Sequence, residues 1–157
     1  IPHWEKPSII KDLTFQSILT TAKDILPDLR QSVDLLIVAY HGGFERDLQT
    51  GLPTESLTGE NEAYQLVEEY KDYIDALVTG HQHREIADHL FGVPVIQPGY
   101  RGAFVGEIEL ELDNHKKVVA SNARLHKTEN CKVSSEVNQL ISDVSEEAED
   151  WLDQPMG

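Results

Sequence analysis

Histidines lie at two places in this sequence where an apolar run gives way to a glycine-containing loop. His41 begins the tripeptide His41-Gly42-Gly43, and His81 and His83 lie further along the chain in the segment 80–83. Neutral imidazole is the nitrogen ligand that zinc, manganese and iron most often take in proteins. Because the carboxyl ends of parallel strands meet at one edge of an α/β sheet, we expect the three imidazoles to converge there. The spacing therefore predicts a metal site, although a histidine at a strand end also serves as an ordinary hydrogen-bonding residue.

His81 and His83 are separated by one residue on a loop that Gly80 makes permissive. In an extended backbone the side chains at i and i+2 leave on the same face, so we expect both rings to reach one small site. The remaining histidines lie in segments without ligand spacing, and we expect surface or hydrogen-bonding roles for them: His3, His89, His115 and His126.

The runs that precede the histidines have the composition of buried strands. Residues 34–40 predict a fully buried strand that ends at His41, and residues 74–79 predict a second strand that ends at Gly80. Residues 93–97 predict a short third strand. These strands must position the histidines.

Apolar periodicity predicts the helices between and after them. One helix covers 15–29, with Thr14 as its N-cap and with Pro27 kinking or ending it near Ile25. A long loop over 44–58 leads to a second helix at 63–70.

The last third of the chain has a different pattern. Residues 104–112 alternate apolar and polar side chains, which predicts a half-exposed strand, and residues 118–125 return as its antiparallel partner. An amphipathic helix follows over 137–151. The whole order predicts an α/β fold with a mixed-sheet sandwich.

Charge excludes some classes of partner. The formal net charge is −15, from 28 acidic and 13 basic residues. Such a field repels nucleic-acid polymers and anionic membranes, but bound cations at a site still admit a small phosphate ester. Between Glu136 and Asp153 there are seven acids and no lysine or arginine, which is typical of a solvated helix face. No targeting segment or bilayer-length apolar run is found, and the single thiol of Cys131 leaves the compartment open between cytoplasm and export.

Several of these segments together resemble a known family. The stretch from Asp34 through Gly80-His81-Gln82-His83, the segment 95–99 and the alternating strand 106–112 look like the calcineurin-like metallophosphoesterases. Within them the chain is similar to the 5'-nucleotidase and 2',3'-cyclic-nucleotide phosphodiesterase branch. The likeness covers most of the chain, including residues 1–5 and 152–157, and the Gly-His-x-His element is its most specific part.

The resemblance implies a domain organisation. Residues 1–132 correspond to the second half of a four-layer α/β/β/α metallophosphoesterase domain. Residues 133–157 correspond to an acidic amphipathic helix that leads to a C-terminal nucleotide-binding domain outside the chain.

The resemblance also implies a cofactor and its ligands. Two divalent ions (manganese, zinc or iron) clamp the phosphoryl group in this family, and a bound hydroxide attacks it. His41 and His81 then ligate one ion and His83 the other. The carboxylate ligands and the catalytic histidine are expected N-terminal to Ile1, so no catalytic residue is assigned in this chain, and we expect the chain alone to be inactive.

Four further residues have weaker indications of a role. Arg101 is a candidate phosphate contact, against the simpler interpretation of a surface arginine, and Phe44 and Tyr100 are candidates to flank a nucleotide base. Gln82 either orients a neighbouring ligand or is an ordinary loop residue.

Three functions fit these sequence patterns. The leading hypothesis is metal-dependent hydrolysis of nucleotide phosphate esters, with a nucleotide or other small phosphate ester as substrate and the N-terminal half of the same domain as partner. The first alternative is a non-catalytic metal-binding or interaction module on the same scaffold. The second is an unrelated α/β domain with coincidental histidines, whose stability would not respond to metal.

Overall fold

The computed structural model describes residues 4–155, so His3 and the last two residues lie outside the described part. Its elements are α1 (Pro7–Ile10), α2 (Ile18–Ser32), β1 (Ile37–Tyr40), α3 (Ala63–Tyr70), β2 (Ala76–Thr79), β3 (Glu85–Leu90), β4 (Val93–Pro98), β5 (Phe104–Leu112), β6 (Val118–Lys127) and α4 (Ser135–Leu152). Residues through Lys127 form one unit, and residues from Thr128 form a second.

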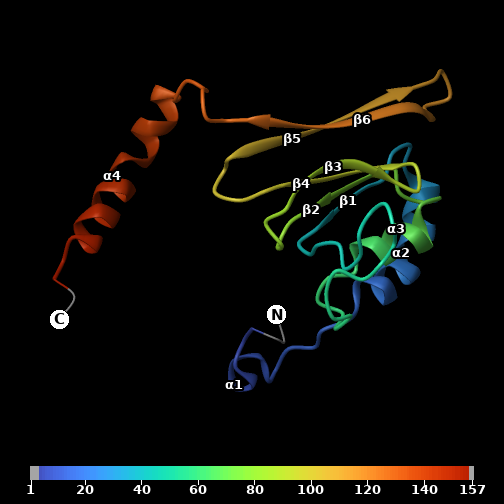
Figure 1. Cartoon of the computed structure of the whole chain (residues 1–157), viewed down its shortest axis with the longest axis horizontal. Helices are drawn as coiled ribbons and strands as arrows, with labels where there is room; N and C mark the ends of the chain where they lie inside the picture. The colour runs from blue at the N-terminus through green and yellow to red at the C-terminus, as the bar shows by residue number, and fades with distance from the viewer. Residues whose placement is uncertain (1–3, 156–157) are drawn as a thin grey trace. The chain divides into compact units, whose positions relative to one another are not determined.

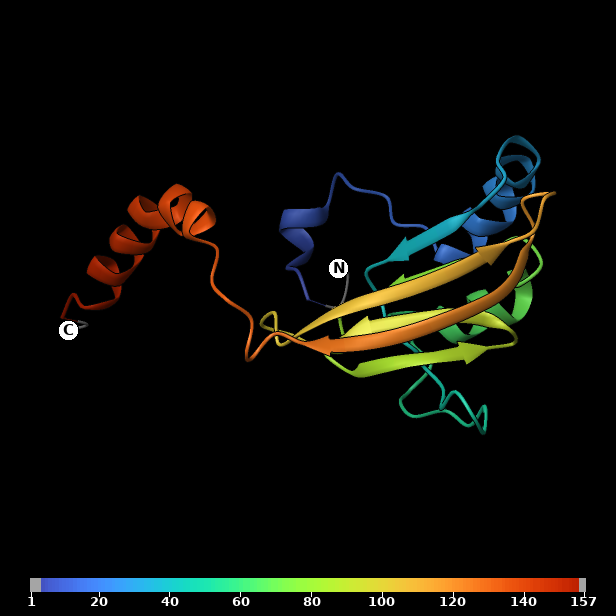
Figure 2. The same ribbon diagram turned by 90° about the horizontal axis from the view of Figure 1, so that it is seen from above.

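The first unit is built on a mixed four-stranded sheet in the order β1-β2-β4-β3. β1, β2 and β4 run parallel, and β3 pairs antiparallel with β4. The helices α2 and α3 lie on one side of this sheet, and the β5–β6 hairpin lies over the other side (Figures 1 and 2). The prediction of a mixed α/β fold is confirmed.

The strand β3 was not expected from the sequence. Residues 85–90 carry two acids and a histidine, but Ile86 and Leu90 are buried on one face. A two-residue turn at Phe91 (φ 51°) and Gly92 (φ 88°) joins β3 to β4, and positive φ at both positions is the geometry that matches the twist of a hairpin. The sequence feature that indicates β3 is therefore the Phe-Gly turn and not the composition of the strand.

The first long helix differs from its prediction at both ends. Ser17, not Thr14, is the N-cap of α2, and its hydroxyl accepts a hydrogen bond from the amide of Leu19 at 3.1 Å. The helix passes through Pro27 and continues to Ser32 instead of ending near Ile25. Proline removes one hydrogen bond from a helix, and the burial of Ala22 and Leu26 holds α2 against the core across that gap.

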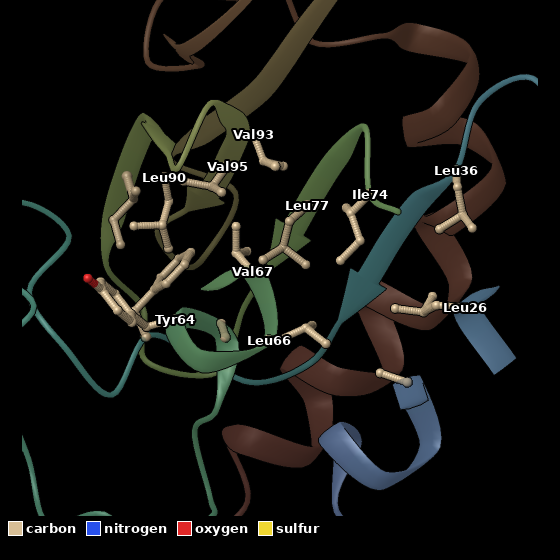
Figure 3. Packing of buried hydrophobic residues seen from close by; sticks show 14 residues of the cluster. Leu26, Leu36, Tyr64, Leu66, Val67, Ile74, Leu77, Leu90, Val93 and Val95 are labelled. Carbon is tan, nitrogen blue, oxygen red and sulfur yellow. The ribbon is translucent and has the colours of Figure 1, made fainter. Parts of the chain in front are cut away.

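The core lies between this sheet and the two helices. Figure 3 shows Leu66 and Val67 of α3 directed toward Leu77 of β2, with Val95 of β4 beside them. All four side chains are completely buried. Beneath the sheet, the Arg30 guanidinium of α2 forms an ion pair with Asp75, and the same carboxylate accepts the amide of Leu36 at 2.7 Å. These contacts join α2 to the residues that directly precede β1 and β2.

The strand β1 is less buried than the sequence predicted. It is four residues long, and Ile37 is 58% exposed. It lies at the end of the strand order, so only Val38 and Tyr40 on its helix side pack against the core. The prediction of a fully buried strand was wrong because, among the described residues, nothing pairs with the second edge of β1 or covers Ile37.

The second unit contains the predicted acidic helix. Ser134 caps α4 by accepting the amide of Val137 at 3.3 Å, and none of its residues is buried. Its exposed apolar side chains include Val137, Leu140, Ile141, Val144 and Trp151. Between residues 4 and 155, no helix combines the length and the apolar character needed to cross a membrane.

Candidate functional site

The loop that carries His41 is shaped by two glycines. A Cβ atom on Gly42 would lie 2.1 Å from Cζ of Tyr40, and one on Gly43 would lie 2.1 Å from Oε1 of Gln82. Both positions are therefore closed to any larger residue while these neighbours stay in place. The His-Gly-Gly element lets the chain leave β1 and turn close against the loop that follows β2.

The loop that carries His81 and His83 is not extended. His81 has φ 68° and His83 has φ 59°, so both lie in the left-handed region that non-glycine residues rarely adopt. The expectation that an extended backbone sends both rings to the same face was wrong. Two left-handed residues turn the chain sharply, and the two imidazoles acquire different neighbours.

Gln82 joins the two loops. Its Oε1 accepts the amide of Phe44 at 2.9 Å, and its Nε2 donates to the carbonyl of Phe44 at 3.1 Å. A third bond runs from the amide of Gly80 to the carbonyl of Gly42 at 3.2 Å. The side-chain amide thus pairs with a peptide group much as a neighbouring strand would, and its contacts explain why the loops lie side by side.

His41 and His81 meet where these loops touch. Their ring centroids are 5.5 Å apart, with the planes at 71° to one another. A Cβ atom on Gly80 would be 3.2 Å from Nδ1 of His41, so the glycine leaves room for that ring. The structure therefore brings together two of the three predicted ligands from the ends of adjacent strands.

Glu60, from the segment before α3, completes this group. Its Oε1 lies 2.7 Å from Nε2 of His81 and accepts the indole N–H of Trp4 at 2.5 Å. The Trp4 and His81 rings are 6.4 Å apart and edge to face. Glu60 was missed in the sequence because a single acid in a polar loop carries no spacing signal.

His83 belongs to a second group. Its ring stacks on Tyr100 at a centroid distance of 5.1 Å and an interplanar angle of 14°, and the Arg101 guanidinium lies 5.3 Å from the centre of the Tyr100 ring. Arg101 has φ 58°, and both Tyr100 and Arg101 are exposed. Two of the candidate substrate contacts are thus grouped with the third histidine.

Phe44 has a different role from the one predicted. Its side chain is fully buried in the core cluster, where it presents no face to a ligand. The interpretation that Phe44 flanks a nucleotide base is therefore set aside in favour of packing. Its backbone, through Gln82, is what contributes to the site.

The remaining histidines behave as expected where they are described. His89 shares a hydrogen bond with Ser121 at 2.9 Å, and His126 lies 3.3 Å from Glu107. His115 is exposed at the hairpin turn, where its amide donates to Asp113.

Buried polar side chains stabilise the segments next to the loops after β1 and β2. Gln97, completely buried in β4, accepts the amide of Arg84 at 2.7 Å and donates to the Thr79 hydroxyl at 3.1 Å. The buried Glu45 carboxylate accepts hydrogen bonds from the backbone amides of Tyr64 and Gln65. These amides lie in the first turn of α3, where the helix itself offers them no acceptor. Sequence reasoning missed Gln97 and Glu45 because their partners are distant along the chain.

A groove of about 530 Å³ flanks His41. Its lining combines the apolar side chains Phe15 and Ile18 with polar and acidic ones, among them Ser17, Glu60 and Glu62. Burial, reinforced by the charge of Glu62, raises the pKa of Tyr40 to about 12, so this phenol is neutral at physiological pH. Among the described residues that line this groove, none is a lysine or arginine that could receive an anion.

The described residues do not make a closed metal site. Between residues 4 and 155, no group of three or more histidine, cysteine, aspartate or glutamate side chains is arranged to hold one ion. The pair of imidazoles from His41 and His81 is a partial donor set of a type suited to zinc, manganese or iron.

Comparisons with known proteins give consistent similarities, although no protein-family model matches the sequence. The chain is 29% identical over 126 residues to the 2',3'-cyclic-nucleotide 2'-phosphodiesterase/3'-nucleotidase of Salmonella typhimurium, which is 71% of this chain and 18% of the relative. It is 27% identical over 128 residues to the trifunctional nucleotide phosphoesterase protein YfkN of Bacillus subtilis, which is 72% of this chain and 8% of that relative.

A solved structure matches the fold as well. It is that of a provisionally assigned 5'-nucleotidase from Staphylococcus aureus in complex with α-ketoglutarate. The TM-score is 0.79 with 38% sequence identity, over 92% of this chain and 29% of that one. The chain thus spans less than a third of the length of each of these relatives.

Proposed function

Because the chain is related in sequence and in fold to nucleotide phosphoesterases of the 5'-nucleotidase branch, we propose that it is part of an enzyme that hydrolyses phosphate esters of nucleotides. The reaction is of the 5'-nucleotidase or the 2',3'-cyclic-nucleotide phosphodiesterase type. The observation that carries the proposal is the meeting of His41 and His81 at the ends of adjacent parallel strands, within a fold shared with a 5'-nucleotidase structure.

The proposal includes two divalent ions, with His41 and His81 as ligands of one and His83 as a ligand of the other. His83 faces Tyr100 rather than the other two rings, which is compatible with a separate ion. Bound divalent ions supply charge that polarises phosphoryl oxygens and lowers the pKa of a bound water. Three imidazoles are too few for such a centre, so the proposal places its carboxylate ligands in polypeptide outside residues 1–157.

Electrostatics support the involvement of cations. The groove beside His41 is lined by Glu60 and Glu62, and the net charge of the chain is −15. A phosphate ester approaching this surface is repelled unless positive charge is bound there. In this proposal the chain contributes imidazole ligands and an acidic surround, and the ions make the site attractive to an anion.

The exposed margin of the sheet supports the proposal that more of the same domain packs here. An apolar cavity of about 200 Å³ opens between the sheet and the hairpin, lined among others by Ile37, Val78, Ile96 and Ile108. Burying apolar surface of this kind is favourable, and an open strand edge accepts another strand. We propose that the N-terminal half of the domain covers this margin and that the chain alone is inactive.

The division of the chain also remains a proposal. Residues 1–132 belong to the phosphoesterase domain, and residues 133–157, which contain α4, lead to a nucleotide-binding domain. The separate unit that begins at Thr128 and the exposed apolar side chains of α4 support this division.

The test is phosphate release from 5'-AMP and 3'-AMP, and chromatographic detection of the ring-opened monophosphate formed from 2',3'-cyclic AMP, by the complete polypeptide that the gene encodes. We expect EDTA to abolish turnover and Mn²⁺ or Zn²⁺ to restore it, and we expect His81→Ala to abolish turnover in a folded protein. His89→Ala is the matched control, because His89 is exposed and its ring is hydrogen-bonded to Ser121, away from the other histidines. Near-normal turnover by folded His81→Ala would refute the ligand role.

In the non-catalytic alternative, the same scaffold binds a metal ion or a partner and hydrolyses nothing. In that case none of the three substrates is turned over, with or without added metal, while Mn²⁺ or Zn²⁺ still binds and raises Tm.

A further inference from the structure

We infer that Glu60 is a positioning residue for His81: its carboxylate holds the imidazole proton on Nε2 and thereby leaves Nδ1 as the nitrogen offered to an ion. The inference rests on the proposed ligand role of His81. The distance from Oε1 of Glu60 to Nε2 of His81 is 2.7 Å, and both side chains are about a quarter exposed, at 23% and 28%. A carboxylate only accepts hydrogen bonds, so a neutral ring in this contact must carry its proton on Nε2.

The backbone around Glu60 fixes the carboxylate in this position. The Tyr40 hydroxyl donates to the carbonyl of Glu60 at 3.2 Å, which joins the segment to the end of β1. The next residue, Asn61, is 6% exposed, and its Oδ1 accepts the amide of Gly43 at 2.6 Å. Asn61 also donates to Glu55 at 2.8 Å. Glu60 is therefore held against the histidine loops through its own carbonyl and through the next residue, Asn61.

The ring of His81 is constrained on several sides. His41 and Trp4 both contact it edge to face, and its own backbone is left-handed. With the ring oriented by these groups and Nε2 bonded to Glu60, Nδ1 is the one nitrogen with a lone pair available. Imidazoles that ligate metals usually donate their second N–H to a carboxylate or carbonyl, which raises their basicity, and loss of such a partner weakens metal binding about 10- to 100-fold.

The chain offers a matched control two residues away. Glu62 carries the same charge on the same segment, but its carboxylate is bonded to Ser17 at 3.1 and 3.3 Å. Glu62→Ala therefore removes one negative charge from the groove without removing the contact to His81. An effect of Glu60→Ala that Glu62→Ala does not reproduce belongs to the contact and not to the general field.

The experiment is ¹⁵N NMR of the complete, metal-free polypeptide labelled at histidine, at about pH 8.5, where histidine is ordinarily neutral. We expect one tautomer of His81, with the proton on Nε2, in the wild type and in Glu62→Ala. Glu60→Ala should lose the slowly exchanging Nε2–H resonance and populate both tautomers. A wild-type proton on Nδ1, or a His81 spectrum unchanged in Glu60→Ala, would overturn the inference. This readout requires no turnover, so it stands apart from the test of the proposed function.

A second variant guards against misfolding. Glu60→Gln keeps the size of the side chain and an acceptor oxygen while it removes the charge, so the Nε2–H resonance should move upfield as the hydrogen bond weakens. With Mn²⁺ as the probe, both Glu60 variants should bind more weakly than Glu62→Ala, and Glu60→Ala by about 10- to 100-fold. Equal Mn²⁺ affinity in Glu60→Ala and Glu62→Ala would contradict the positioning role.

Discussion

β1 and β2 run side by side and each delivers a site histidine, but the chain supports them very differently. In β2, Ala76, Leu77 and Thr79 are buried, and the strand lies between β1 and β4. In β1, Ile37 is exposed, and the strand has a single partner among the described residues. The exits also differ, since buried Gln97 holds the loop after β2 at the Arg84 amide, whereas the loop after β1 is held by Gln82 at Phe44 and by Asn61 at Gly43.

This difference shows that the strand leading to His81 is fixed by the core of the chain, whereas the strand leading to His41 is packed on one side only. His81 follows a strand that already belongs to the core, and His41 follows a strand with one partner, so the position of His41 depends more on contacts made by its loop. Four experiments can break or sharpen this comparison, in order of decreasing effect.

The largest difference is expected between equivalent truncations in the two strands. Leu77→Ala should lower the free energy of unfolding by about 3 kcal/mol, because it opens a cavity in a completely buried position. Ile37→Ala should cost less than about 1 kcal/mol, because that side chain is already exposed to water. Urea denaturation of the 157-residue chain measures both values. Similar losses from the two substitutions would show that β1 is as well packed in solution as β2.

A buried amide should be the next most sensitive feature. Gln97→Leu preserves volume but leaves the Arg84 amide without its acceptor, and we expect a loss of about 2 kcal/mol in unfolding free energy. Gln139→Leu, on the exposed surface of α4, is the matched control and should stay within about 0.5 kcal/mol. If both substitutions leave the free energy of unfolding unchanged, the hydrogen bonds of Gln97 to Arg84 and Thr79 contribute nothing to stability.

The link between the two loops should give a smaller global effect and a clear local one. Gln82→Ala removes both hydrogen bonds to Phe44 from a partly exposed side chain, so we expect a loss of about 1 kcal/mol. Amide hydrogen exchange should accelerate at Phe44 but not at Leu36, whose amide is bonded to Asp75. Unchanged exchange at Phe44 would mean that the loop after β1 holds its shape without β2.

The last effect, a pH dependence that is absent near neutral pH, concerns the end of β1. Burial and the nearby Glu62 carboxylate raise the pKa of Tyr40 to about 12 from the ordinary 10.0, so folding favours the neutral phenol. That contribution to stability is complete below pH 10 and is lost as the pH rises toward 12. Ultraviolet difference spectra should show a late tyrosine titration that is missing in Tyr40→Phe. A Tyr40 that ionises near pH 10 would place its ring in solvent.

The sequence was sufficient for features that repeat along the chain. Alternation predicted the hairpin of β5 and β6, and apolar periodicity predicted α3 and α4. Each of these elements is recognisable from its own residues, because the side chains that define the pattern all lie within it.

Features that depend on distant partners could not be found in this way. Ile37 has the composition of a buried residue, but its exposure is set by the position of β1 at the end of the sheet. Pro27 signals a helix end, but packing of Leu26 carries α2 past it. Glu60 and Gln97 became significant only when the fold brought them to His81 and Arg84.

The left-handed backbone at His81 and His83 has a consequence for how these positions vary. Such a conformation costs an L-residue about 1 kcal/mol, and glycine, asparagine and aspartate tolerate it best. A library of variants selected for folding alone should therefore become enriched in glycine and asparagine at both positions. Histidine should persist there only in a population that is also selected for what the imidazole does.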